Sequence, residues 1–282
     1  MLFVGSCFAD NIGQRFRDEG FPVTVNPFGT MYNPASVLHT LERIAPDGGR
    51  PWPRIVFITL GTNHVYRLRE TGEIVDNCEK RPQRLFQEEL LTVDVCADYL
   101  RRAVALLQSR RPDVHVVFTV SPIRYRKYGY HESQLSKATL LLAVERVTSP
   151  TSPTSPTSPT SYFPAYELVM DELRDYRFYA PDMIHPSPQA VDYLWERLVD
   201  SYFSPAAKNY LHEWRPLRQA LSHKPFHPDS EEYRRFRETT LQRLSAFMAK
   251  YPGFVNPQLD GGVPEPRNPN NYTKKKSNLS SR

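Results

Sequence analysis

The chain has 282 residues, of which 40% are hydrophobic and 12% aromatic, so it can bury one sizeable α/β core and is not a disordered chain. Its formal net charge of +5 is unevenly distributed, because residues 261–282 carry five basic side chains and one acidic one. A basic tail on a nearly neutral body is weak support for a nucleic-acid surface, and we expect no nucleic-acid partner.

The three cysteines, Cys7, Cys78 and Cys96, are few and odd in number, as in proteins whose thiols stay free in a reducing compartment. No stretch has the length and apolarity of a membrane span, and no basic region followed by an apolar core opens the chain. We therefore expect a cytoplasmic protein without a signal peptide or a membrane partner. Only Met1 to Val4 remain for the first strand, which leaves open a natural start further upstream.

Short runs rich in Val, Ile and Phe alternate with segments of helical periodicity along the first 200 residues. The predicted strands are residues 2–5, 21–25, 54–60, 114–120 and 175–179. The predicted helices cover about 8–19, 34–44 behind the N-cap Asn33, 93–110 behind Thr92, 133–147, 164–173 and 187–203. This alternation predicts an α/β fold with a parallel, doubly wound sheet of about five strands and helices on both faces.

Other segments depart from this alternation. Residues 65–68 and 73–75 flank Glu70-Thr71-Gly72, which predicts a hairpin over the edge of the sheet. Residues 148–161 are Thr-Ser-Pro repeats, which predict a solvated, polyproline-like loop inserted in a main domain of residues 1–203. Residues 204–251 predict a helical C-terminal extension with helices at about 205–221 and 229–250. Residues 252–282 predict a disordered basic tail.

Side chains capable of chemistry follow the predicted strands, at the sheet edge where parallel sheets bind their ligands. They are Ser6 and Cys7 after the first strand, Gly29 after the second, Asn63 after the third, Ser121 after the fourth, and Asp182 and His185 after the fifth. A nucleophile, an imidazole and an orienting carboxylate together are typical of a hydrolase that works through a covalent intermediate. Neither a ligand cluster at zinc spacing nor a phosphate-binding Gly-rich loop occurs, so we predict no metal and no cofactor.

The stretch Gly5-Ser6-Cys7-Phe8-Ala9 is the signature of the GSCFA family, which belongs with the SGNH/GDSL hydrolase superfamily, and the chain resembles that family from residue 1 to about residue 200. Further stretches that resemble it are 26–29, 32–34, 60–62, 65–66, 119–122, 135–138, 163–167, 173–179 and 182–186. The resemblance implies a three-layer α/β/α sandwich with the nucleophile after the first strand.

The resemblance also implies roles for individual residues. It places Gly29 and Asn63 in the oxyanion hole and makes Asp182 and His185 the carboxylate and the base. Members of the superfamily carry Gly-Asp-Ser-Leu at the nucleophile, and a gap-free overlay puts Cys7, not Ser6, on that serine. We therefore favour Cys7 as the nucleophile and keep Ser6 as the alternative.

Two positions depart from the family pattern. The family has His in an Asn-Cys-His-Lys segment where this chain has Glu79, and it has His at the end of Ser-Pro-Val-Arg-His where this chain has Tyr125. If those imidazoles line the substrate site, the specificity or activity of this chain differs. The resulting substrate-site candidates are Asn77, Cys78, Ser121, Arg124 and Tyr125.

The favoured function is that of an esterase or acyltransferase acting on an O-acyl ester, with a carbohydrate or a small metabolite as substrate by analogy of fold alone. One alternative is a catalytically inactive SGNH-like domain that binds an acylated ligand. Another is an adaptor that recruits a partner through the repeat loop and the basic tail. The sequence does not predict the oligomeric state.

Overall fold

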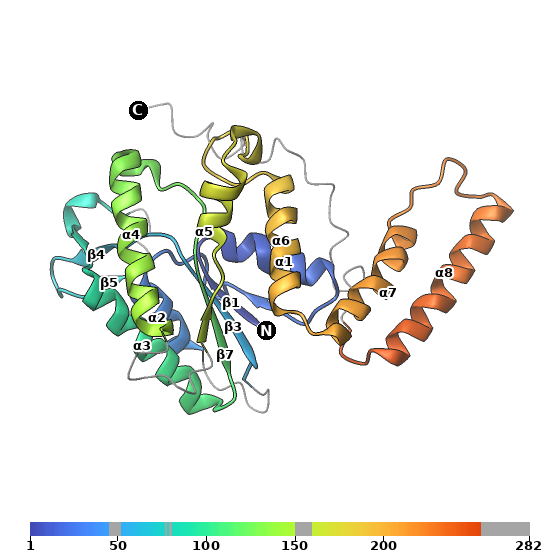
Figure 1. Cartoon of the computed structure of the whole chain (residues 1–282), viewed down its shortest axis with the longest axis horizontal. Coiled ribbons are helices and arrows are strands. Elements are labelled where there is room, and N and C mark those ends of the chain that lie inside the picture. Colours follow the sequence, from blue (N-terminus) through green and yellow to red (C-terminus); the bar gives the residue numbers. More distant parts are fainter. Residues whose placement is uncertain (45–51, 77, 79–80, 150–159, 255–282) are drawn as a thin grey trace. The chain divides into compact units, whose positions relative to one another are not determined.

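The computed structural model describes residues 1–44, 52–76, 78, 81–149 and 160–254. It contains a five-stranded parallel sheet in the order β2-β1-β3-β7-β8, of which β1, β3 and β7 are labelled in Figure 1. These strands are β1 (Leu2–Gly5), β2 (Thr24–Val25), β3 (Ile55–Leu60), β7 (His115–Val120) and β8 (Thr160–Tyr162). β1, β3 and β7 are buried nearly throughout, so they consist of continuous apolar runs, as the centre of a parallel sheet requires.

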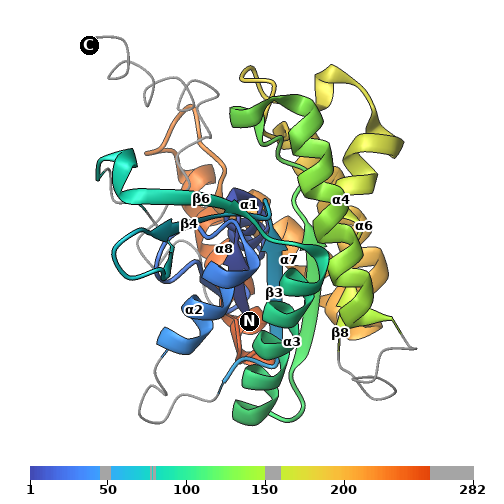
Figure 2. The same cartoon turned by 90° about the vertical axis from the view of Figure 1, so that its left-hand side faces the viewer.

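Helices α2 (Pro34–Arg43), α3 (Val93–Arg110) and α4 (Gly129–Thr148) cover one face of this sheet (Figures 1 and 2). Their apolar sides and one side of β1, β3 and β7 form a single core. The two predicted N-caps are present, because Asn33 Oδ1 accepts from Ser36 N at 2.9 Å and the Thr92 side chain accepts from Val95 N. The helix predicted to begin at 133 begins one turn earlier, at Gly129.

The opposite face of the sheet is covered by the first part of α1 (Cys7–Asp18) and by α5 (Ala165–Glu167), which continues as a π-helical segment over Leu168–Leu173. On this face the rings of Phe3 and Phe57 stack with their centroids 4.6 Å apart. α6 (Pro188–Tyr202) follows, and Ala190, Val191 and Leu194 in its N-terminal half are buried. Helices on both faces make the fold a three-layer α/β/α sandwich, as predicted.

The order of the strands locates the site. From β1 the chain moves outward to β2, and it then crosses over to β3 on the other side of β1. Such a reversal leaves a crevice at the carboxyl ends of the two strands where the direction changes, here β1 and β3. Ser6 and Cys7 follow β1, and Asn63 follows β3. These predicted site residues therefore lie at this crevice.

A small antiparallel sheet in the order β5-β4-β6 follows β3. β4 (His64–Leu68) and β5 (Ile74–Val75) form the predicted hairpin. β6 (Phe86–Leu90), preceded by the short helix Gln83–Leu85, was not predicted, because Gln87, Glu88 and Glu89 give it little apolar content. Its pairing with β4 holds Glu88 beside His64.

The predicted fifth strand, residues 175–179, is wrong. Tyr176–Phe178 is a 3-10 turn, in which Asp175 Oδ1 accepts from Arg177 N at 2.9 Å. The alternation of aromatic and charged residues there resembles a strand, but this local hydrogen bond competes with extended pairing. The fifth strand is instead β8, at the end of the predicted repeat loop. Thr148 ends α4 and Thr160 begins β8, while residues 150–159 of that loop lie outside the described residues.

The chain divides into two compact units, and the second consists of residues 15–22 together with the chain from Trp195 onward. It contains α7 (Pro205–Leu221) and α8 (Glu231–Lys250), close to the predicted bounds, around the fully buried Trp214. Phe254, which the prediction placed in the disordered tail, is buried in this core with its ring centroid 4.7 Å from that of Trp214. The rest of the predicted tail, 255–282, lies outside the described residues. Within the described part of the chain, every helix is too short or too polar to span a membrane.

Candidate active site

The turn between β1 and α1 requires a glycine at position 5. Gly5 has φ +140°, and a Cβ there would lie 2.0 Å from the carbonyl oxygen of Thr59 on the neighbouring strand. The Gly5 N–H donates to Asn26 Oδ1 at 2.8 Å, and Asn26 Nδ2 donates to Asp10 Oδ1 at 2.7 Å. Asn26 therefore ties the end of β1 to the first turn of α1, and the backbone passes close enough to β3 to fix the two residues that follow.

Ser6 points into the protein. Its side chain is 1% exposed, and its Oγ lies 3.0 Å from Thr59 Oγ1 and accepts from Phe8 N at 3.3 Å. Its backbone N–H donates to Thr59 O at 3.0 Å. Ser6 thus caps the start of α1 and joins it to β3, which is a structural role for its hydroxyl.

Cys7 is the first residue of α1 and is only partly buried. Its Sγ lies 3.4 Å from the Tyr32 hydroxyl, and the thiol also hydrogen-bonds with His185. The first backbone N–H groups of a helix have no acceptor within it, and its dipole favours negative charge at this end. The thiol therefore lies where a thiolate is stabilised.

Asp182 and His185 are joined as an Asp–His pair. His185 Nδ1 lies 2.6 Å from Asp182 Oδ2, while Asp182 Oδ1 accepts the backbone N–H groups of Ile184 at 2.9 Å and His185 at 3.0 Å. Met183, with φ +61°, makes the sharp turn that lets one carboxylate reach all three groups. Because Nδ1 faces Asp182, Nε2 is the ring nitrogen left to interact with Cys7.

Cys7, His185 and Asp182 shift one another's pKa values through their hydrogen bonds and charges. Burial alone raises the pKa of the Cys7 thiol, but the hydrogen bonds with His185 and Tyr32 and the charge of His185 lower it below its ordinary value. The hydrogen bond with Cys7 raises the pKa of His185, and Asp182 adds to this rise. Burial also raises the pKa of Asp182, yet its hydrogen bonds lower it overall. The shifts of Cys7 and His185 both favour a thiolate beside an imidazolium.

The two residues predicted for the oxyanion hole donate their hydrogen bonds to backbone carbonyl groups of the protein. The Gly29 N–H donates to Asn26 O at 2.9 Å, and Asn63 Nδ2 donates to Leu91 O at 2.8 Å. Asn63 itself is 5% exposed, and its Oδ1 is buried without a partner. The backbone N–H of Cys7 belongs to the residue that carries the reactive sulfur, and the Tyr32 hydroxyl lies 3.4 Å from that sulfur. Burial and the neighbouring Cys7 raise the pKa of Tyr32, so its hydroxyl stays protonated and can donate.

α4 holds the turn that leads from β3 to β4. Ser136 Oγ accepts from Asn63 N at 3.0 Å and lies 3.0 Å from Thr62 Oγ1. Lys137 Nζ donates to Gly61 O at 2.7 Å. The backbone N–H groups of Gly61 and Thr62 in turn donate to Tyr32 O. These contacts position Tyr32 beside Cys7. Residues 135–138, through Ser136 and Lys137, therefore help to position a residue of the site.

The substrate-site candidates are distributed around this centre. Asn77 lies outside the described residues, and burial raises the pKa of the partly exposed Cys78 thiol. Ser121 is fully buried, and its Oγ accepts from Ile123 N, so it shapes its loop instead of facing a substrate. Arg124 and Tyr125 lie in the same loop and face different surroundings, since Arg124 contacts the ring of Tyr179 and Tyr125 that of His64.

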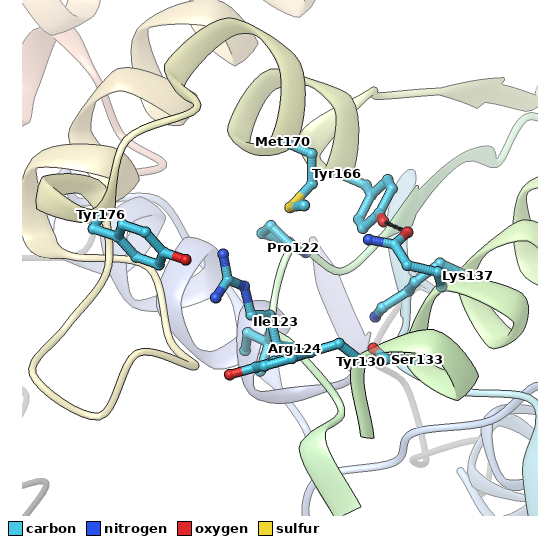
Figure 3. A pocket seen from close by; sticks show the side chains of 10 residues that line it. Pro122, Ile123, Arg124, Tyr130, Ser133, Lys137, Tyr166, Met170 and Tyr176 are labelled. Atoms are coloured by element: carbon cyan, nitrogen blue, oxygen red, sulfur yellow. Dashed lines mark hydrogen bonds between the residues drawn. The ribbon is translucent and has the colours of Figure 1, made fainter. Parts of the chain in front are cut away.

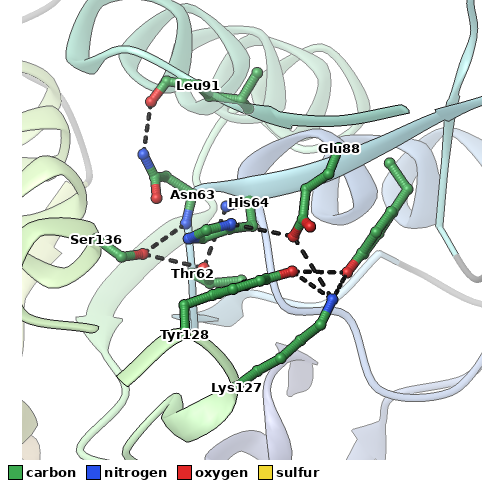
Figure 4. A network of polar contacts seen from close by, with 9 residues as sticks. Thr62, Asn63, His64, Glu88, Leu91, Lys127, Tyr128 and Ser136 are labelled. Carbon is green, nitrogen blue, oxygen red and sulfur yellow. Dashed lines mark hydrogen bonds and ion pairs between the residues drawn. The ribbon is translucent and has the colours of Figure 1, made fainter. Parts of the chain in front are cut away.

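A network of polar and aromatic side chains around His64 was not predicted (Figure 4), and the ring centroid of Tyr125 lies 5.7 Å from that of His64. His64 stacks on Tyr128 with ring centroids 4.3 Å apart, and its Nδ1 lies 3.3 Å from Glu88 Oε1. Lys127 Nζ donates to the hydroxyls of Tyr66 and Tyr128 and lies 3.7 Å from Glu88. The network brings two tyrosine hydroxyls and one ammonium together.

Comparison with known proteins places the chain in a family. The model of the GSCFA family matches residues 1–48 and 53–198, and the model of the GSCFA domain protein, C-terminal domain, matches residues 214–256. No curated protein matches. One solved structure that does match is that of a "putative platelet activating factor" from Streptococcus pneumonia, with 15% identity, a TM-score of 0.45, and coverage of 71% of this chain and 81% of that one.

Proposed function

This chain belongs to the GSCFA family, and we propose that it is an SGNH-like enzyme that cleaves or transfers an O-acyl ester with Cys7 as its nucleophile. One observation carries the proposal. His185 and Tyr32 both contact the Cys7 thiol, whereas the adjacent Ser6 hydroxyl is buried against Thr59. A thiol with a lowered pKa, a base and an orienting carboxylate is the arrangement of a covalent acyl transfer.

In the first step the Cys7 thiolate attacks the ester carbonyl carbon, and the carbonyl oxygen takes the negative charge. When the tetrahedral intermediate collapses, the C–O bond breaks and His185 Nε2 gives its proton to the leaving alcohol. This leaves the acyl group on Sγ as a thioester. In the second step water, or an acceptor alcohol, gives a proton to His185 as it attacks that thioester, which releases the acid or the new ester and restores the thiol.

Asp182 does not exchange protons in this scheme. Its carboxylate binds Nδ1 and thereby keeps Nε2 directed at the sulfur, and it stabilises the imidazolium. We assign the oxyanion to the Cys7 backbone N–H and the Tyr32 hydroxyl. Loss of one donor of this kind typically costs about 3–4 kcal/mol in the barrier.

The test uses the full chain and a short-chain aryl ester such as 4-nitrophenyl acetate. His185→Ala is expected to lower kcat/KM by about 100-fold or more, because it removes the general base. The exposed His131 supplies the control, since His131→Ala leaves Cys7 and Asp182 untouched. Undiminished turnover by a folded His185→Ala protein would rule out the proposed base.

A binding domain without turnover is the second candidate. It is favoured by the commitment of Gly29 N–H and Asn63 Nδ2 to protein acceptors, which leaves the oxyanion with fewer donors than the superfamily pattern implies. Absence of turnover across a panel of acetyl, butyryl and aryl esters would support this candidate over the enzyme.

A further inference from the structure

A pocket lies beside the loop that follows β7, between that loop, α4, and the α5 and Tyr176 segments (Figure 3). Its volume of about 230 Å³ exceeds that of several waters, each of which occupies about 30 Å³ in the liquid. The lining combines tyrosine rings with apolar side chains, among them Tyr130, Tyr166, Tyr176, Ile123 and Met170. Two cations, Arg124 and Lys137, complete it, and none of the ten described lining residues is acidic.

Lys137 is a buried cation without a counter-charge. Its side chain is 2% exposed, and its Nζ donates to one protein acceptor, Gly61 O, although an ammonium has three protons to donate. Within the described chain no carboxylate pairs with it, and burial lowers the pKa of its amine to about 7. An ammonium buried in this way is costly unless an anion or further acceptors approach it.

Arg124 lies at the other side of the same pocket. Its guanidinium carbon is 4.0 Å from the ring centroid of Tyr179, 5.4 Å from that of Tyr130 and 5.6 Å from that of Tyr176. These rings orient the guanidinium, but they do not neutralise it. Of the described acidic side chains, none forms an ion pair with it. A planar, oriented guanidinium is suited to binding a carboxylate through two parallel hydrogen bonds.

The pocket is connected to the Cys7 centre by the backbone. Arg124 N donates to Ile184 O at 3.2 Å, directly before His185. Lys137 binds Gly61, whose N–H donates to the carbonyl of Tyr32 at 2.7 Å. The two cations therefore adjoin the segments that hold the base and the phenol of the site.

We propose that this pocket binds a carboxylate on the substrate, held between Arg124 and Lys137 with its organic body against the tyrosine rings. The apolar and aromatic lining selects an organic acid over a small inorganic ion, which has no surface to place against Tyr166, Met170 and Ile123. Assignment of the carboxylate to an ester substrate rests on the proposed function, whereas the binding of the anion does not.

Binding of the anion is measured by calorimetry on the full chain with benzoate as the probe and benzamide as its uncharged isostere. Benzoate should bind with saturation, and benzamide about tenfold or more weakly, because it lacks the charge. Arg124→Gln and Lys137→Met should each weaken benzoate binding about tenfold or more. Arg126→Gln, which removes an exposed charge from the same loop, should leave it unchanged. Lys137→Met keeps the shape of a buried side chain and should fold.

Equal affinity for benzoate and benzamide, or no binding of benzoate at all, would overturn the proposal. A loss of benzoate affinity in Arg126→Gln as large as that in Arg124→Gln would also overturn it. Unchanged binding of benzoate in Lys137→Met would contradict the role of Lys137 as a ligand of the carboxylate and leave it only its hydrogen bond to Gly61 O. A third probe, inorganic phosphate, distinguishes the anions, since tighter binding of phosphate than of benzoate would contradict an organic carboxylate.

A second measurement compares 4-acetoxybenzoate with its neutral methyl ester. The value of kcat/KM should be about tenfold or more higher for the charged ester than for the neutral one. In Arg124→Gln the ratio of the two values should be close to one. Equal use of both esters by the wild-type chain would overturn the assignment of the carboxylate to the substrate. Hydrolysis of neither ester, with benzoate binding retained, would contradict the proposed function and leave the anion pocket standing.

Discussion

At the residue scale, the structure separates two adjacent nucleophile-type side chains by their environment. Ser6 is buried and bonded to Thr59, while Cys7 faces His185 and Tyr32. The signature placed both residues at the end of β1, and the register of the resemblance favoured Cys7. Sequence alone could not predict the burial of Ser6, because it depends on the approach of Thr59 from a strand more than fifty positions away.

The first prediction concerns these two residues. Cys7→Ala should lower ester turnover by several orders of magnitude, because it removes the attacking atom. Ser6→Ala should keep most of the turnover but destabilise the fold by about 1–3 kcal/mol, since it leaves Thr59 Oγ1 buried without its partner. Turnover and urea unfolding measure the two effects. A dead Ser6→Ala and an active Cys7→Ala would make Ser6 the nucleophile.

The second prediction follows from the pKa shifts. Cys7 should react with iodoacetamide faster than Cys78 or Cys96, because burial raises the pKa of both other thiols. The rate at Cys7 should rise with pH and reach half its maximum below the ordinary thiol pKa. In His185→Ala the hydrogen bond and the charge of His185, which lower the pKa of Cys7, are lost, so that midpoint should move to higher pH. Peptide mapping by mass spectrometry measures the rates, and an unmoved midpoint would refute the thiol–imidazole coupling.

At the scale of elements, local signals predicted most of the fold. The buried strands, the caps at Asn33 and Thr92, and the hairpin after β3 lie where apolar runs and turn residues placed them. Two strands were missed, β6 and β8, because neither carries an apolar run and both are defined by pairing with a distant partner. Such tertiary pairing can override the local propensity of a short segment.

The third prediction concerns the junction between β1 and α1. Gly5→Ala should destabilise the fold by more than about 3 kcal/mol. The added Cβ would lie 2.0 Å from the Thr59 carbonyl oxygen, and the alanine would have to adopt an unfavourable φ. Gly29→Ala is the matched control. Its φ is +91° but no atom lies within 4 Å of the added Cβ, so only the backbone strain of about 1–2 kcal/mol remains. Equal losses of unfolding free energy in the two variants would contradict the overlap at Gly5.

At the scale of the whole molecule, every residue of the proposed centre belongs to the first unit, and the second unit has a core of its own. The resemblance covered the first unit and predicted the Asp–His pair and the thiol. It did not predict Tyr32 or Lys137 as parts of the site, because their significance lies in contacts among the end of β3, α4 and the β2–α2 connection. The oxyanion donors that it implied, Gly29 and Asn63, donate to protein acceptors in this chain.

The fourth prediction tests the core of the second unit. Trp214 is fully buried, with its ring centroid 5.6 Å from that of Phe247 and 4.7 Å from that of Phe254. Trp214→Ala should cost about 3–5 kcal/mol of the unfolding free energy of this unit through the cavity it leaves. Arg215→Ala, on the exposed side of the same helix, should change it by less than about 0.5 kcal/mol. Equal denaturation curves for the two variants would contradict the buried position of Trp214.

The central claim is that an acyl group passes through the Cys7 sulfur. It is tested most directly by quenching the wild-type chain in acid during turnover of 4-nitrophenyl acetate and mapping the added mass by peptide mass spectrometry. We predict a gain of one acetyl group on Cys7, absent from Cys7→Ala and retained in Ser6→Ala. An acetyl group on Ser6, or turnover without any acylated peptide, would contradict the account.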